Sequence, residues 1–265
     1  RMPRFKYDLD VASPGGAGRN RVLSKKDFLK IKVLRPPYEE QKKIANILNQ
    51  IDTEIEFYER LLKPKINLRK SIIKKVLRKD IRFKEFKDEW QDCKIIDLLN
   101  YEQPSKYICN NILKYSKSLT PVLTANKSFI LGSTNETEGV FNNIPVIIFD
   151  DFTTNMKYVD FPFKVRSSAI KILKSKKKDL NLKYVFELMK NLKVVLGDHK
   201  RYYISEFQHM KVKMPSLDEQ DKISNFIFSL DDEINLLKKE IHEFKKQKRG
   251  LMQLLLTGIV RVKVN

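Results

Sequence analysis

Apolar residues recur at alternating steps of four and three positions in two long stretches of the chain, which is the spacing of a coiled-coil seam. The spacing predicts two helices of roughly 40 residues, each about 60 Å long at 1.5 Å per residue. One helix alone cannot bury a stripe of this length, so we expect the two to pack together. The seam residues are Ile44, Leu48, Ile51, Ile55, Tyr58, Leu62, Ile72 and Val76 in the first stretch, and Ile223, Ile227, Leu230, Ile234, Leu237, Ile241, Phe244, Leu251 and Leu255 in the second.

The two stretches are copies of each other at a shift of 179 residues, which places Lys211 over Lys32 and holds without a gap to Lys84 and Lys263. Pro64 lies inside the first copy and should kink or divide that helix. The alternative is that both are ordinary core helices. Helix composition alone would not match Pro, Gln and Asn at one shift, so we expect a spacer. The identical pairs include Pro36/Pro215, Glu40/Glu219, Gln41/Gln220, Lys43/Lys222, Ile44/Ile223, Asn46/Asn225, Asp52/Asp231, Glu54/Glu233, Ile55/Ile234 and Arg82/Arg261.

The segment between the copies has a different texture, with more aromatic and β-branched residues and no helical periodicity. Residues 145–149 and 168–173 are typical of buried strands, and 122–124 and 128–131 of shorter ones. Residues 182–196 are typical of a helix. The segment therefore predicts a domain of α+β or α/β type, and a globular domain between the copies makes the two long helices antiparallel.

The chain carries 53 Lys and Arg against 33 Asp and Glu, a formal net charge of +20. Such an excess favours a polyanionic partner, either nucleic acid or an anionic membrane surface. No apolar run reaches the ~18 residues of a membrane span. Cys93 and Cys109 form no Cys-x-x-Cys pair, so we expect no metal site and a reduced, cytoplasmic protein. Residues 213–258 carry eight charges of each sign, which suits a protein partner.

Polar clusters follow the expected strands and helix of the middle segment. Asn and Thr side chains read base edges in DNA, whereas Lys and Arg contact bases or phosphates. The alternative for each of these residues is an ordinary polar loop. The candidate DNA contacts are Lys117, Thr124, Asn126, Lys127, Thr153, Thr154, Asn155, Lys157, His199, Lys200, Arg201 and Tyr202.

The start of each long helix resembles a motif of Type I restriction–modification specificity subunits, Pro-x-x-Glu-Gln-x-Lys-Ile. The first copy reads Pro37-Tyr38-Glu39-Glu40-Gln41-Lys42-Lys43-Ile44, and the second reads Ser216-Leu217-Asp218-Glu219-Gln220-Asp221-Lys222-Ile223, with Ser216 in place of Pro. Trp90, with Ile95-Ile96 soon after, resembles the start of a target recognition domain of that family. Arg201-Tyr202-Tyr203-Ile204-Ser205 resembles its end.

The resemblance implies an α+β chain: the remnant of a first recognition domain (1–35), a first spacer helix (36–79), an α/β target recognition domain (80–213), a second spacer helix (214–258) and a tail (259–265). The two helices would pack as an antiparallel coiled coil. It also implies a non-catalytic subunit that reads one half of a bipartite double-stranded DNA site and docks two methyltransferase (M) subunits through its helices. Restriction/translocase (R) subunits would join through the complex. S-adenosylmethionine, ATP and Mg are expected on those partners, and no cofactor in this chain.

Family members have two complete recognition domains, whereas this chain has one and a short remnant. A truncated form and a half-subunit that pairs with itself both remain open. Self-pairing would give a twofold-symmetric reader of a palindromic split site. The alternative function is a coiled-coil interaction scaffold without specific DNA binding.

No catalytic constellation stands out in the sequence. Arg35-Pro36-Pro37-Tyr38 is similar to the Asn/Asp-Pro-Pro-Tyr motif of amino-methyltransferases, but Arg35 cannot accept hydrogen bonds from a substrate amine. Asp80 with Glu85 and Lys87 is only faintly similar to a nuclease site and lies in a charged boundary segment. We therefore expect no catalytic residue and no metal ligand.

Overall fold

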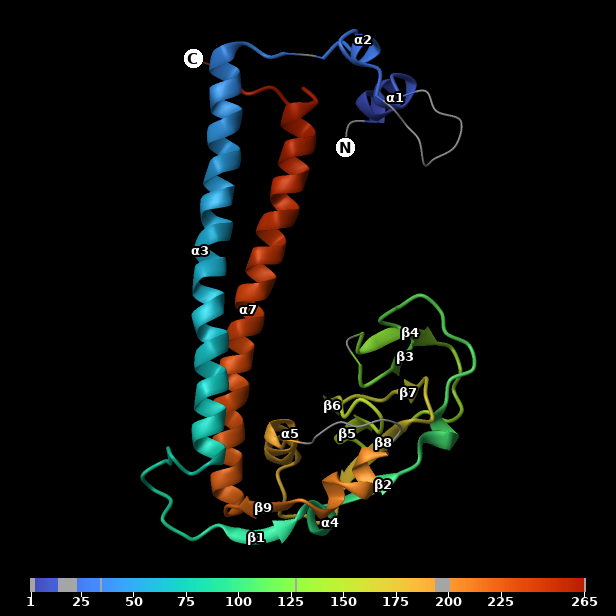
Figure 1. Cartoon of the computed structure of the whole chain (residues 1–265), viewed down its shortest axis with the longest axis vertical. Coiled ribbons are helices and arrows are strands. Elements are labelled where there is room, and N and C mark those ends of the chain that lie inside the picture. Colours follow the sequence, from blue (N-terminus) through green and yellow to red (C-terminus); the bar gives the residue numbers. More distant parts are fainter. Residues whose placement is uncertain (1–2, 14–22, 34, 127, 194–200, 265) are drawn as a thin grey trace. The chain divides into compact units, whose positions relative to one another are not determined.

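The computed structural model describes residues 3–13, 23–33, 35–126, 128–193 and 201–264. They form two compact units, a helical unit (Arg1–Leu68 with Asp231–Asn265) and a globular unit (Arg69–Leu230). The long helices α3 (Tyr38–Leu77) and α7 (Leu217–Leu256) each have one end in the helical unit and the other end in the globular unit (Figure 1). The helical unit also contains α1 (Pro3–Val11) and α2 (Lys25–Phe28).

Within the helical unit, α3 and α7 run in opposite directions (Figure 1). Asp52 pairs with Lys248, Glu59 with Lys245 at 2.6 Å, and Lys65 with Glu233, so rising numbers on α3 meet falling numbers on α7. The rings of Tyr58 and Phe244, both on the expected seam, lie 5.5 Å apart between centroids. The predicted antiparallel pairing is therefore confirmed in this unit.

The seam residues divide between the two units. In the helical unit Ile44, Ile51, Ile55, Ile234 and Ile241 are buried, and Leu48, Leu62 and Leu237 are half-buried. In the globular unit Ile223 and Ile227 lie in a core that also contains Ile73 and Val76 of α3, and Leu230 is half-buried. Helix α3 continues through Pro64, so the division considered at this residue is absent.

The ends of the two helices have the same hydrogen bonds, shifted by the repeat. Gln41 Nε2 donates to Pro36 O at the start of α3, as Gln220 Nε2 does to Pro215 O at the start of α7. Beyond the last turns, Lys79 and Gly258 both have a positive φ, 68° and 73°. The amide of Ile81 donates to Lys75 O, as that of Val260 does to Leu254 O. The repeat therefore specifies both the first turn and the termination of each helix.

The globular unit contains three small sheets. A four-stranded antiparallel sheet has the order β2-β8-β5-β6, a three-stranded sheet has the order β4-β3-β7 with β3 and β7 parallel, and β1 pairs with β9 alone. The strands are β1 (Gln91–Lys94), β2 (Leu99–Glu102), β3 (Thr120–Leu123), β4 (Ile130–Thr134), β5 (Val146–Asp150), β6 (Met156–Val159), β7 (Lys164–Val165), β8 (Ile170–Ser175) and β9 (Lys211–Met214).

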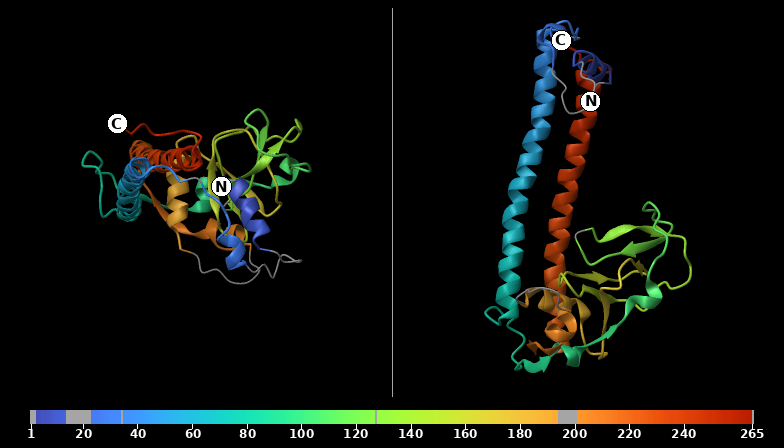
Figure 2. Two further views of the ribbon diagram at one scale, coloured as in Figure 1. Left: turned by 90° about the horizontal axis from the view of Figure 1, so that it is seen from above. Right: turned by 45° about the vertical axis from the view of Figure 1, so that its right-hand side comes forward.

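The central strand β5 is buried on both faces because it separates two apolar cores. Ile147 and Phe149 face the core that contains α5 (Leu182–Asn191) and the ends of α3 and α7. Val146 and Ile148 face the core that contains β3 and β7. In Figure 2, α5 lies between the strands of the sheet and α7; Lys183 of α5 lies 4.6 Å from the ring centroid of Phe228 on α7.

Short helices complete the globular unit: α4 (Ile95–Leu98), α6 (Tyr202–Ser205) and two 3₁₀ turns, η1 (Pro104–Tyr107) and η2 (Phe207–His209). This unit extends beyond the predicted limits of 80 and 213. It takes in the inner ends of both long helices, since Ile73 and Ile223 belong to its core. No helix within the described ranges is long and apolar enough to cross a bilayer.

Candidate nucleic-acid interface

A tight turn between β5 and β6 presents three of the predicted DNA-contacting residues. The Asp150 carboxylate accepts the amides of Phe152 (3.1 Å) and Thr153 (2.9 Å), an arrangement in which an Asp side chain mimics a backbone turn. Thr154 has a φ of 57°, in the left-handed region, and its amide donates to Asp150 O. Asp150 itself is buried, so its role is to shape the turn.

The turn is joined to the loop that follows β3 through side chains. Asn126 Oδ1 accepts hydrogen bonds from Thr153 Oγ1 and from Asn155 Nδ2, both at 3.1 Å. Residues that are nearly thirty positions apart therefore form one polar cluster, which we call the Asn126 cluster (Asn126, Thr153 and Asn155). With its oxygen directed at the turn, the Asn126 amide presents its nitrogen on the other side. Hydroxyl and amide groups held in this way can bond to base edges.

Arg201 is held near the same turn by a buried aspartate. Asp151 is 1% exposed; its backbone oxygen accepts the amide of Tyr202 and its Oδ1 accepts the amide of Tyr203, both at 2.9 Å. The buried ammonium of Lys171 lies 3.5 Å from Asp151 Oδ2 and compensates its charge. Arg201 is exposed and directly precedes these two amides. Asp151 therefore fixes both the turn and the backbone next to Arg201.

Tyr202 itself corrects one prediction. Its side chain is 2% exposed and belongs to the core beneath the sheet, so it is not available to contact DNA. Thr124 is also buried, and its Oγ1 accepts the amide of Asn126 at 3.3 Å, so it shapes the loop that carries the cluster. Thr124 and Tyr202 thus have structural roles. Their positions in the sequence do not distinguish them from residues at the surface.

Arg166 is a basic residue of this surface that sequence reasoning missed. Its amide donates to Leu123 O at 3.2 Å, so it lies beside the point where β3 leads into the Asn126 loop. The side chain is exposed, and Nη1 donates to Cys109 O at 3.4 Å. A single Arg after a two-residue strand has no sequence pattern that marks it as a candidate contact. Its place near the Asn126 loop follows from the parallel pairing of β3 and β7.

The remaining predicted contacts are less closely linked to the cluster. Lys117 is exposed in the loop before β3, and Lys157 on β6 is half-buried with its ammonium 6.0 Å from the ring centroid of Phe129. Lys127, His199 and Lys200 lie outside the described residues.

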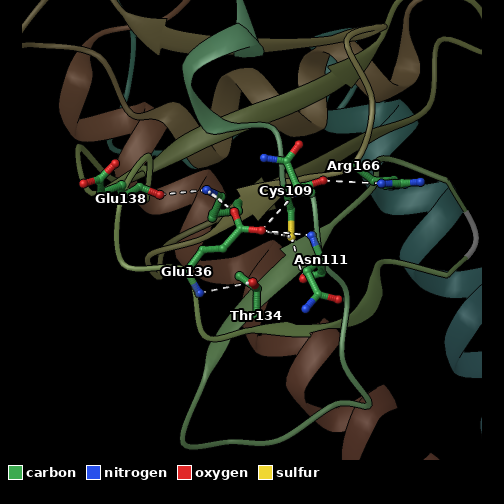
Figure 3. Close-up of polar contacts among 8 residues, drawn as sticks. Cys109, Asn111, Thr134, Glu136, Glu138 and Arg166 are labelled. Carbon is green, nitrogen blue, oxygen red and sulfur yellow. Dashed lines mark hydrogen bonds and ion pairs between the residues drawn. The ribbon is translucent and has the colours of Figure 1, made fainter.

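A second polar cluster lies where the segments around Cys109 and Glu136 meet (Figure 3). Glu136 Oε1 accepts the amides of Asn110 (3.1 Å) and Asn111 (2.9 Å), and Oε2 lies 2.7 Å from the ammonium of Lys164, which is only 4% exposed. The Lys164 ammonium, followed by the two amides, lowers the pKa of Glu136 to about 2. Every strong donor of this cluster is used in joining loops to β7, so its role is structural.

Among the described residues, no group of three His, Cys, Asp or Glu side chains is placed to hold a metal ion. The Asn126 cluster itself consists of neutral hydrogen-bonding groups, and the exposed Arg166 and Arg201 lie on segments whose backbones bond to the ends of β3 and β5 nearby. Such groups recognise a polyanion and its polar edges.

Comparison with known proteins identifies the chain. The family model described as "Type I restriction modification DNA specificity domain" matches residues 9–66 and 87–246. The chain belongs to this family. The first matched segment runs into α3, and the second covers most of the globular unit and α7, so the specificity-domain family accounts for both copies of the repeat.

Curated relatives of this specificity-domain chain are subunits of Type I restriction enzymes. The "EcoR124I/EcoR124II specificity subunit" of Escherichia coli is 38% identical over 170 residues, which cover 57% of this chain and 42% of that protein. The "MjaVIII specificity subunit" of Methanocaldococcus jannaschii is 26% identical over 284 residues, which cover 91% of this chain and 65% of that protein. The chain thus spans less than two thirds of the length of these relatives.

A solved structure shares the fold. The Type I restriction–modification S subunit from M. genitalium aligns with 86% of this chain and 62% of its own, with a TM-score of 0.63 and 18% sequence identity. A further structure, of a Type I restriction–modification system, aligns with 96% of this chain at a TM-score of 0.53 and 12% identity. The specificity-subunit fold is therefore present in this chain.

Proposed function

We propose that this chain is a sequence-specific DNA recognition subunit of a Type I restriction–modification complex, and that its globular unit reads one half of a bipartite double-stranded site. The family match and the relatives named as specificity subunits support this reading. The observation that carries it is the Asn126 cluster, in which amide and hydroxyl groups from two separate loops bond to one another, with exposed Arg166 and Arg201 on segments whose backbones bond near the same loops.

The proposed division of work follows from chemistry. Asn126, Thr153 and Asn155 offer both donors and acceptors, which distinguish base pairs in the major groove. Arg166 and Arg201 contact phosphate, which fixes the register but carries no sequence information. The chain itself is non-catalytic in this proposal. Methylation and cleavage belong to the M and R subunits, which bind S-adenosylmethionine, ATP and Mg.

The partners follow from the same proposal. Two M subunits dock on the long helices, the R subunits join through the assembled complex, and the complex acts on DNA in the cytoplasm. The charge balance of residues 213–258 supports a protein partner for α7. Self-pairing of two chains is a further proposal within this scheme. Light scattering of the chain with and without an M subunit tests it, and a monomer in both conditions contradicts it.

Selection of bound oligonucleotides from a random double-stranded library, with an M subunit present, tests the recognition function. We expect enrichment of a short half-site by the wild-type chain. Asn126→Ala should relax the preference at one or more positions of that half-site, because it removes an amide and frees Thr153 and Asn155. Lys30→Ala is the control, since its exposed side chain lies outside both the globular unit and the two long helices.

Absence of any enriched sequence, with binding of the M subunit intact, would contradict DNA reading and favour the interaction scaffold. Enrichment that is identical for wild type and Asn126→Ala would remove the Asn126 cluster from the proposal while leaving DNA recognition in place.

A further inference from the structure

An exposed phenylalanine lies in the turn between β5 and β6. The side chain of Phe152 is 50% exposed, and within the described ranges no aromatic ring or ammonium group packs against its ring. The two residues that precede it, Asp150 and Asp151, are buried at 6% and 1% exposure. The chain therefore passes from the core to the surface at Phe152 and presents an apolar ring to solvent there.

Hydrogen bonds hold the backbone on either side of this ring. Asp150 Oδ1 accepts the amide of Phe152 at 3.1 Å and that of Thr153 at 2.9 Å. Directly before Phe152, the backbone oxygen of Asp151 accepts the amide of Tyr202 at 2.9 Å. A side chain carried on a backbone that is already fixed loses less conformational freedom when it binds a partner. The turn therefore preorganises Phe152 for a contact outside the chain.

The polar groups of the Asn126 cluster adjoin Phe152 along the chain. Thr153, the next residue, donates from Oγ1 to Asn126 Oδ1 at 3.1 Å, and Asn155 Nδ2 donates to the same oxygen at 3.1 Å. A single apolar residue at a protein surface is ordinary. Phe152 differs from such a residue because it shares its turn with fixed amide and hydroxyl groups of the kind that bond to base edges.

We propose that Phe152 is a specificity-determining residue that contacts the 5-methyl group of a thymine in the major groove of the half-site. This inference rests on the proposed function of the Asn126 cluster. That cluster requires the major groove, because only there does each base pair present a distinct set of donors and acceptors. The thymine methyl is the apolar group of that groove, so it is the group that an apolar ring on the same turn fits. The recognised half-site therefore contains a thymine.

The contact adds discrimination between sequences without adding attraction to DNA as such. Exposed basic residues such as Arg166 and Arg201 supply the attraction to phosphate, which is independent of sequence. A phenyl ring has no charge and no hydrogen-bond donor, so it does not contribute to that attraction. Burial of one methyl group changes affinity by about fourfold. Loss of the ring should therefore weaken binding to the selected half-site and leave binding to random DNA unchanged.

Deoxyuridine tests the contact, because it lacks the methyl group of thymine and keeps its hydrogen-bonding groups. The half-site is selected with the full wild-type chain and an M subunit, and each thymine is then replaced in turn while binding is followed by fluorescence anisotropy. At one position, deoxyuridine should weaken binding of the wild-type chain about fourfold. Phe152→Ser should bind the thymine and deoxyuridine forms equally. Phe152→Leu keeps an apolar side chain and should still distinguish them.

Ile81→Ser is the matched control and should retain the full discrimination, because Ile81 is 47% exposed in the globular unit and lies outside both this turn and the long helices. Comparison of variants on the same two DNAs cancels any effect of deoxyuridine on the duplex itself.

The outcomes separate this inference from the proposed function. If no half-site is enriched, DNA reading is contradicted and the inference falls with it. An enriched half-site without thymine overturns the Phe152 contact and leaves recognition by the Asn126 cluster in place. The contact is also overturned if no deoxyuridine position weakens wild-type binding, or if Phe152→Ser is as sensitive as wild type at that position. Loss of random-DNA binding by Phe152→Ser would overturn it too, because the ring would then stabilise the turn.

Discussion

Lys79 and Gly258 hold the same position of the repeat, just beyond the last turn of a long helix, and both have a left-handed backbone. This conformation terminates a helix by offering amides to its last carbonyls. Glycine adopts it without strain, whereas a side chain at Cβ meets the following carbonyl. The first copy therefore tolerates a strained lysine at the place where the second copy has glycine.

Gly258→Ala should lower the free energy of unfolding by about 1 kcal/mol, because alanine is strained at a φ of 73° even though no atom lies within 4 Å of the added Cβ. Gly250→Ala is the matched control, inside the helix that Gly258 follows. It is also unobstructed but lies in the helix interior, where alanine should stabilise by about 1 kcal/mol. Urea unfolding followed by far-UV circular dichroism measures both. Equal signs for the two changes would contradict this account of the helix end.

Glu136 gives the globular unit a pH dependence of known sign. Its pKa lies at about 2, below its ordinary 4.5, so the unfolded chain binds more protons between these values. The stability that Glu136 contributes is therefore complete above pH 4.5 and is lost as the pH falls toward 2. Glu136→Gln should be less stable than wild type at neutral pH, and the difference should shrink through this window.

Thermal unfolding at several pH values measures this difference, and Glu138→Gln is the control. Glu138 is exposed, and the contact that the structure gives it uses its backbone oxygen, which accepts from Lys164. A constant gap between Glu136→Gln and wild type down to pH 2 would show that the carboxylate charge is not the cause.

Individual residues mark the limit of what the sequence could predict. The repeat identified Glu40/Glu219 and Arg82/Arg261 as matched pairs. It did not predict that each Arg bonds to the Glu of the other copy, because the sequence of a helix does not reveal which distant side chains it contacts. Asn126, Thr153 and Asn155 were chosen for their chemistry, and the structure places them together. Tyr202 was wrongly expected at the surface and Arg166 was not considered, because burial and strand pairing depend on residues distant in sequence.

At the scale of elements, the helices were more predictable than the strands. A helical period that recurs along 40 residues is a strong signal, and α3 and α7 each begin two residues after Pro36 and Pro215, respectively. Strands β3, β4, β5 and β8 were expected with shifted ends. Strands β1, β2, β6, β7 and β9 were missed because each has only two to four residues, which is too short for a burial pattern to stand out in the sequence.

The antiparallel seam of the helical unit carries a prediction at this scale. Ile234 is 4% exposed on the seam, and Leu236, two positions along, is 58% exposed. Ile234→Ala should lower the free energy of unfolding by about 2 kcal/mol or more, because it leaves a void between α3 and α7. Leu236→Ala should change it by less than about 0.5 kcal/mol. Urea unfolding measures both, and equal effects would show that these helices do not bury a common seam.

At the scale of the whole molecule, the repeat determines the architecture, whereas the segment between the copies carries the candidate DNA contacts. The repeat governs helix starts, helix ends and ion pairs, and none of the candidate DNA contacts lies within it. Those contacts lie in the segment between the copies, which no copy constrains. A sequence can therefore predict the architecture of a specificity subunit from its repeat and leave the recognised bases undetermined.

The charge of +20 makes salt the measurement that separates phosphate contacts from base contacts. Each phosphate contact releases counterions, so the logarithm of the binding constant should fall with the logarithm of salt concentration by about 0.9 per contact. Arg166→Ala and Arg201→Ala should each reduce this slope by about 1, on selected and random DNA alike, if both contact phosphate. Asn126→Ala should leave the slope unchanged and reduce the preference for the selected half-site. An arginine variant that keeps the full slope but loses base preference would instead be a base reader, because an arginine that pairs with guanine discriminates between sequences and one that pairs with phosphate does not.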